Sequence, residues 1–125
     1  MTALNLAVAG YGKSVSSVRT PRDIEYDAFA RVTRMLRLAA SEGRMGFSRL
    51  SQALHDNRSL WTALAMDVAE PTNLLPQPLR AQIFYLAEFT MHHSAKVLKG
   101  DASVAPLIDI NTAVMRGLRG DQDLG

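Results

Sequence analysis

The sequence of 125 residues contains no cysteine, a single tryptophan and no long hydrophobic run. Without cysteine the chain has no disulfide, no thiolate metal site and no cysteine nucleophile. No segment reaches the roughly 18 continuous apolar residues that a membrane-spanning helix needs. The opening residues lack the basic start and the small-residue cleavage site of a secretory signal. We therefore expect a cytosolic protein that does not insert into membranes.

Side chains that would converge on catalysis or on a metal ion are also scarce. The histidines are His55, His92 and His93. The adjacent pair would point about 100° apart on a helix, so the two rings are poor joint ligands, and no metalloprotease or calcium-loop spacing occurs. His93 falls on an apolar stripe, where a core histidine with a satisfied hydrogen bond is the more common outcome. We expect no enzymatic activity, no metal and no cofactor.

What the sequence does contain is apolar periodicity of the helical kind, with no alternation long enough for a strand. A marginal first helix is expected within 1–18, because Leu4, Val8, Tyr11 and Val15 share one face although two glycines weaken it. Capping residues, glycines and prolines delimit four further helices and a frayed tail at 120–125. Their expected bounds are about 20–42, 47–70, 78–99 and 107–120. The prediction is an all-α fold of about five helices in a single domain, 1–125.

An asparagine stands on the apolar stripe of the third expected helix, beside the one tryptophan. Asn57 lies in the register of Leu54, Trp61 and Leu64, where a leucine would be usual. A buried asparagine has to form hydrogen bonds, because an unpaired one costs about 1–3 kcal/mol. Two interpretations stay open: Asn57 bonds to backbone groups at a bend in the helix or in the connector NLLP (73–76), or it lines a partner groove beside Trp61. The first is the more common fate of such residues.

Charge is unevenly distributed, with seven arginines against four acidic residues in 19–49. Such a run usually forms a solvated helix face, although the arginines of 31–37 would also suit RNA phosphates. A helix-turn-helix with its turn at 55–57 is a weak match, because its second helix would leave few polar side chains for base contacts. We expect no DNA binding.

Several segments, in their order and spacing, resemble the FlaF family of flagellar biosynthesis regulators of alphaproteobacteria. The matching pieces are Tyr11, TPRDIEYDAFARVTRML (20–36), ALHDNRSLWTALAMDVAEPTNLLPQPLRA (53–81) and LIDINTAVMRGL (107–118). The resemblance implies a non-enzymatic regulator that binds flagellin as an export chaperone and promotes its synthesis and secretion. It also implies coupling to a FlbT-type regulator, which restrains translation through the flagellin messenger.

In that role, a helical protein would hold the terminal amphipathic helices of flagellin in an apolar groove. Methionines suit such a groove because thioethers adapt to several partner sequences, although core burial is their more common fate. The candidate methionines are Met35, Met45, Met66, Met91 and Met115. The partner-binding residues expected are Tyr11, Arg22, Asn57, Trp61, Met66, Leu75 and Arg80. Two alternatives stay open: an RNA-binding regulator of the flagellin messenger, and an adaptor that binds only the FlbT-type partner.

Overall fold

The computed structural model describes residues 21–124, and within them the side chains of 26–117. Its elements are α2 (Pro21–Ser41), a short 3₁₀ helix η1 (Gly43–Gly46), α3 (Phe47–Ala69), α4 (Gln77–Leu98) and α5 (Ala105–Leu124). The predicted all-α fold is confirmed, and the four α-helices correspond to the last four that the sequence predicts. The predicted first helix, within 1–18, lies outside the described residues.

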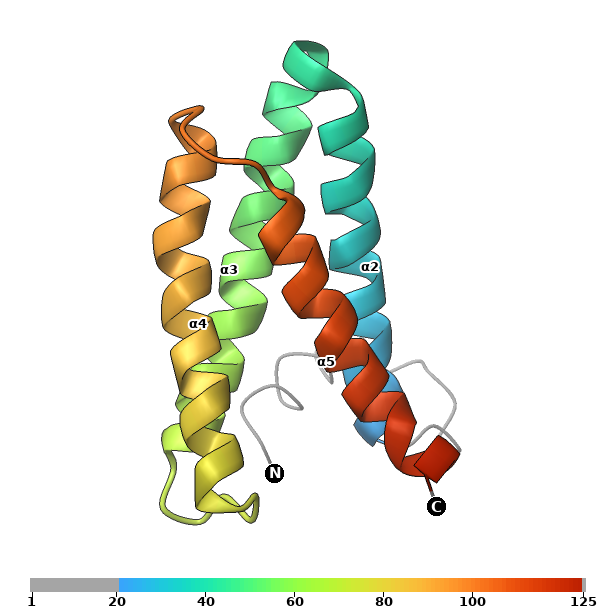
Figure 1. The fold of residues 1–125 in the computed structure, drawn as a ribbon, viewed down its shortest axis with the longest axis vertical. Helices are drawn as coiled ribbons and strands as arrows, with labels where there is room; N and C mark the ends of the chain where they lie inside the picture. The colour runs from blue at the N-terminus through green and yellow to red at the C-terminus, as the bar shows by residue number, and fades with distance from the viewer. Residues whose placement is uncertain (1–20, 125) are drawn as a thin grey trace.

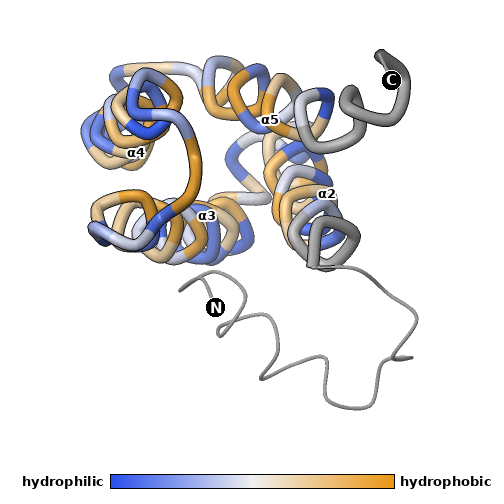
Figure 2. Tube along the Cα trace, turned by 90° about the horizontal axis from the view of Figure 1, so that it is seen from below, coloured by the Kyte–Doolittle hydropathy of each residue, from blue (hydrophilic) through white to orange (hydrophobic). Residues whose placement is uncertain are grey.

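Three of the helices form an antiparallel row, and the fourth crosses that row. Figure 1 shows α3 between α2 and α4, while α5 runs obliquely from the far end of α4 toward the beginning of α2. The end view in Figure 2 shows the four helices at the corners of the bundle. α3 packs against both of its neighbours in the row, and α5 packs mainly against α2. α3 is therefore the central element of the bundle.

Two glycines end helices where the sequence predicts that helices end. Gly43, after α2, has φ +59°, and Gly100, after α4, has φ +79°. After α4, the Gly100 amide donates to the Val97 carbonyl at 3.0 Å and the Asp101 amide donates to the Lys96 carbonyl at 2.9 Å. This left-handed cap satisfies carbonyls that the end of the helix would leave unpaired.

The helix boundaries agree with one expectation and correct another. α3 is continuous through His55–Asn57, so the turn that a helix-turn-helix requires is absent from this helix, in line with the weak match of the sequence to that motif. α5 continues through Gly120 to Leu124, beyond the predicted end, because a glycine in a helix lowers stability without necessarily stopping the helix. At the start of α5, the Ser103 hydroxyl accepts a hydrogen bond from the Ala105 amide at 2.9 Å, so Ser103 supplies the cap.

The hydrophobic core lies between the row and α5. The largest fully buried apolar side chains are Trp61, Phe29, Leu36, Leu54 and Leu107. The rings of Phe29 and Trp61 meet edge to face, with their centroids 5.7 Å apart. This geometry is favourable for aromatic pairs because the positive edge of one ring meets the negative face of the other. The four α-helices α2 to α5 all contribute buried apolar side chains to this one core cluster.

Asn73 organises the connector between α3 and α4. Its side-chain Nδ2 donates to the Asp67 carbonyl at 3.2 Å, and its Oδ1 accepts from the Leu75 amide at 3.0 Å. The Asn73 amide also donates to the Glu70 carbonyl at 3.0 Å. These bonds pair backbone groups that the chain leaves free as it reverses direction. They bring α4 back along α3 and set the two helices side by side.

Candidate partner-binding groove

A chain of buried hydrogen bonds answers the question raised by the asparagine on the apolar stripe. The Trp61 indole Nε1 donates to Asn111 Oδ1 at 2.9 Å, and Asn111 Nδ2 donates to Asn57 Oδ1 at 2.8 Å. All three side chains have no exposed surface. Among the described residues, Asn57 Nδ2 finds no hydrogen-bond partner. These hydrogen bonds therefore link α3 to α5 through the middle of the core.

This geometry gives Asn57 a structural role and leaves neither Asn57 nor Trp61 accessible to a partner. The bonding differs from the backbone bonding at a bend that the sequence favours, since α3 is unbent and the partner is a side chain. The sequence analysis does not identify Asn111. Its signal is its position four residues after Leu107, a second asparagine on an otherwise apolar stripe.

Among the described residues, an apolar groove open to the surface lies between the second half of α3 and the first half of α4. It has a volume of about 240 Å³ and is open to solvent. Its lining residues are Thr62, Ala65, Met66, Ala69, Phe84, Ala87, Glu88 and Met91. We call this feature the α3–α4 groove.

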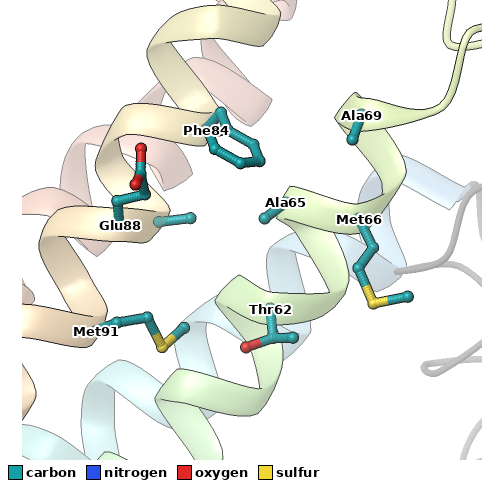
Figure 3. Close-up of a pocket in the computed structure, with 8 residues that line it drawn as sticks. Thr62, Ala65, Met66, Ala69, Phe84, Glu88 and Met91 are labelled. Carbon is teal, nitrogen blue, oxygen red and sulfur yellow. The ribbon is translucent and has the colours of Figure 1, made fainter.

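The side chains of the α3–α4 groove follow from the helical register. Figure 3 shows Phe84 and Met91 extending from α4 toward α3, where the opposite wall carries the small side chains of Ala65 and Ala69. Phe84 and Met91 are seven residues apart, two turns of a helix, so they share one face. Phe84 is 44% exposed although it is a large aromatic residue. Small residues on one wall and large apolar ones on the other leave room for an apolar side chain.

The structure brings some of the predicted partner-binding residues to this groove. Met66 lines its outer rim and is 62% exposed. Arg80 is four residues before Phe84, which places it on the same face of α4, one turn nearer the connector. The exposed Leu75 lies in the connector itself. Tyr11 lies outside the described residues.

The structure describes the side chain of Arg80 but not that of Arg22. Arg80 Nη1 donates to the Glu70 carbonyl at a long 3.5 Å, and its buried Nε has no partner among the described residues. The guanidinium therefore lies near the connector with donors remaining. Arg22 belongs to the first turn of α2, but its side chain lies outside those that the structure describes.

The sequence analysis does not predict the residues that form the walls of the groove. Phe84 lies outside the inward apolar stripe of the fourth predicted helix, and the small residues Ala65 and Ala69 give no sign of a binding surface. An aromatic residue outside the inward stripe, seven residues before a methionine, is the pattern that indicates a second apolar face.

The five candidate methionines divide between core and surface. Met35, Met91 and Met115 are partly buried and pack against the core cluster, and Met91 also lines the groove. Met45 and Met66 are exposed, at 92% and 62%. Of the two exposed methionines, Met66 is the one that belongs to the α3–α4 groove.

The arginine-biased segment forms an exposed face on α2. Arg31, Arg34 and Arg37 are all exposed. Arg37 Nη2 donates to the Thr112 hydroxyl on α5 at 3.2 Å, so this arginine joins two helices. The face is accessible to solvent, as expected of a charged helix side.

His93 forms a hydrogen bond, as the sequence predicts, but its side chain is only partly buried and does not belong to the core. Its Nε2 lies 2.7 Å from the Ser103 carbonyl oxygen, within hydrogen-bond distance, and its ring stacks on Phe89 with centroids 5.2 Å apart. Within 21–124, no group of three or more histidine or acidic side chains is placed to hold a metal ion. None of the helices in that part of the chain is long and apolar enough to span a bilayer.

Comparison with known proteins identifies a family that this chain matches. The model of the family described as "Flagellar protein FlaF" matches residues 7–118, almost the whole chain. No curated protein and no solved structure matches it. The match covers all of the groove and the buried asparagine–tryptophan chain. The chain therefore belongs to the FlaF family of flagellar proteins.

Proposed function

We propose that this protein binds flagellin as an export chaperone, and that the α3–α4 groove receives one of flagellin's terminal amphipathic helices. The observation that carries the proposal is the open apolar groove in a member of a flagellar protein family. In this role the protein promotes flagellin synthesis and secretion together with a FlbT-type translational regulator. No catalytic group takes part, and the protein acts in the cytoplasm.

The size of the groove suits an amphipathic helix. On α3 its lining runs from Thr62 to Ala69, a separation of seven positions, which spans about 10 Å or two helical turns. Helices that bind in grooves present apolar anchors at positions i, i+3 or i+4, and i+7, which cover the same length. Phe84 and Met91 supply large, adaptable contact surface at the two ends of the α4 wall. The groove thus offers contacts for two or three anchors of a client helix.

The connector end of the groove carries a charged side chain, that of Arg80. Arg80 lies one turn before Phe84, and its Nη1 donates to the Glu70 carbonyl at a long 3.5 Å, which places the guanidinium at the connector. A guanidinium at this place favours a carboxylate or the negative C-terminal end of a client helix. Leu75, 39% exposed, extends the apolar surface into the connector. These two residues fix which way round the client helix lies.

Calorimetric titration with monomeric flagellin, at low and at high salt, tests the proposal. Apolar groove binding predicts affinity that changes little with salt and a negative heat-capacity change. Binding of the flagellin messenger through Arg31, Arg34 and Arg37 instead predicts affinity that falls steeply with salt. An adaptor would bind the FlbT-type partner alone and would show no flagellin heat. Absence of flagellin binding at both salt concentrations would overturn the proposal.

A matched pair of variants locates the site. Phe84→Glu places a charge in the groove and should weaken flagellin binding at least about tenfold, or about 1.4 kcal/mol. Tyr85→Glu makes the same kind of change at the neighbouring residue, which is 65% exposed and does not line the groove. That variant should retain the affinity of the parent chain. Equal losses in both variants would place the flagellin site elsewhere on the surface.

A further inference from the structure

The segment that precedes α2 has the chemistry of a groove ligand. Its apolar residues Leu4, Val8, Tyr11 and Val15 recur at spacings of four, three and four, as one face of a helix does. We propose that this face of residues 4–15 docks as a helix in the α3–α4 groove of its own chain, and that flagellin has to displace it. The competition with flagellin rests on the function proposed above, whereas the docking does not.

The start of α2 lies at the right end of the bundle for this arrangement. Figure 1 shows α2 beginning at the end where α3 finishes and α4 begins. The groove extends to that same end, since its lining includes Ala69, the last residue of α3. Five residues, 16–20, separate Val15 from α2 and span up to about 17 Å. Neighbouring helix axes lie about 8–10 Å apart, so this link is long enough to cross α3 and reach the groove.

The same connection sets the direction of the docked helix, and the alignment of its apolar stripe with the α3 wall, Val15 with Ala69, sets its level. A segment that enters α2 at this end runs parallel to α3, because α3 itself finishes there. Val15 then lies level with Ala69, and Val8, seven residues earlier, lies level with Thr62. Tyr11 falls between them, level with Ala65 and opposite the α4 wall. The spacing of the stripe and the spacing of the α3 wall therefore coincide over two turns.

The composition of the segment favours a weak and reversible fit. It has no acidic residue, and its Lys13 lies on the face opposite the apolar stripe, so docking leaves this charge in solvent. Gly10 and Gly12 lower the helix propensity of the segment. A client helix without such glycines displaces it readily.

The absence of cysteine makes a direct test possible in the full chain. Two double variants, Val8→Cys with Thr62→Cys and Val15→Cys with Ala69→Cys, place thiols at matching levels. A disulfide needs Cα atoms about 4–7 Å apart, so these pairs close quickly on mild oxidation only if the segment docks as proposed. The control pairs Lys13→Cys with Ala69→Cys, since Lys13 lies on the opposite face of the segment. Closure of both stripe pairs at the control's rate would overturn the docking.

Flagellin titration of the oxidised and reduced forms then tests the competition. The locked chain should lose most of its flagellin affinity, and reduction should restore it. If the locked and reduced chains bind flagellin equally well, the segment and flagellin do not share the groove, and the competition is overturned. If the stripe pairs close but neither form binds flagellin, the docking is supported and the proposed chaperone function fails.

Discussion

At the scale of single residues, the bond chain of Asn57, Asn111 and Trp61 is the feature that defines this core. A leucine at either asparagine position would fill the space, but it would leave a buried donor or acceptor unpaired. The bonds at 2.9 and 2.8 Å are formed only in one relative position of α3 and α5. These hydrogen bonds therefore fix how α5 is placed on the bundle, because apolar packing alone specifies the relative position of two helices less well.

Substitutions at Trp61 and Asn111 should show a large coupling. Trp61→Phe leaves Asn111 Oδ1 unpaired, and Asn111→Leu leaves the indole N–H unpaired, so each should lower the free energy of unfolding by at least about 1–3 kcal/mol. The double variant removes both polar partners and should lose less than the sum of the single changes. Denaturant unfolding measures the three values. Ser59→Ala, at an exposed position of α3, is the control and should change stability by less than about 0.5 kcal/mol.

Additive losses in that cycle would contradict the hydrogen bond between the indole and Asn111.

The sequence indicates one end of this series of hydrogen bonds, because Asn57 interrupts an apolar stripe. It left the partner open, since two positions 54 residues apart meet only when α5 folds onto α3.

At the scale of elements, the junction of α2 and α3 is tighter than its glycines suggest. A Cβ atom on Gly46 would lie 2.5 Å from the Ala39 carbonyl oxygen and 2.7 Å from Glu42 Cβ. These distances are well below van der Waals contact, and one of the atoms belongs to the backbone. Gly46 is therefore required by close approach of η1 to the last turn of α2, and not by its own backbone conformation.

The glycines of η1 and α5 should respond to alanine in opposite ways. Gly46→Ala should lower the free energy of unfolding by about 1–3 kcal/mol, because the neighbouring backbone has to shift. Gly117, within α5, has no atom within 4 Å of a built Cβ, so Gly117→Ala should raise stability by about 0.4–1 kcal/mol. Thermal or denaturant unfolding of both variants checks the pair. A stable Gly46→Ala protein would mean that the junction is looser than described.

At the scale of the whole molecule, stability is distributed unevenly between α3 and α5. α3 packs on both sides and contains Ala53, Leu54, Asn57, Leu60 and Trp61 among its buried residues. In α5, among the side chains that the structure describes, only Leu107 and Asn111 are buried, both in its first two turns. Arg116 and Gly117 are exposed. After Asn111, the described side chains of α5 are at most partly buried.

Native-state hydrogen exchange should resolve this difference. Amides between Leu54 and Trp61 should exchange only through global unfolding, and their rates should rise with denaturant as global unfolding does. Amides from Gly117 onward should exchange faster by local opening, with little dependence on denaturant. Equal protection of both segments would show that α5 is held along its full length.

The sequence by itself determined the local structure of this protein. Helical periodicity, the glycines at 43 and 100 and the proline-rich connector were enough for the all-α class and for four helices, because each of these signals acts within a few residues. The end of α5 was misplaced, since Gly120 lowers helix stability without breaking the helix.

Only the tertiary structure decided which residues meet. It joined Asn57 and Trp61 to Asn111 inside the core, and it placed Phe84 opposite Ala65 and Ala69 in the groove. Such pairs depend on how the connectors fold α4 and α5 back onto α3, and residues far apart in sequence carry no local sign of that contact. A tryptophan that is buried in the core and one that faces a partner can occupy the same position in the helical repeat. Only the packing of the helices therefore decides that Trp61 is buried.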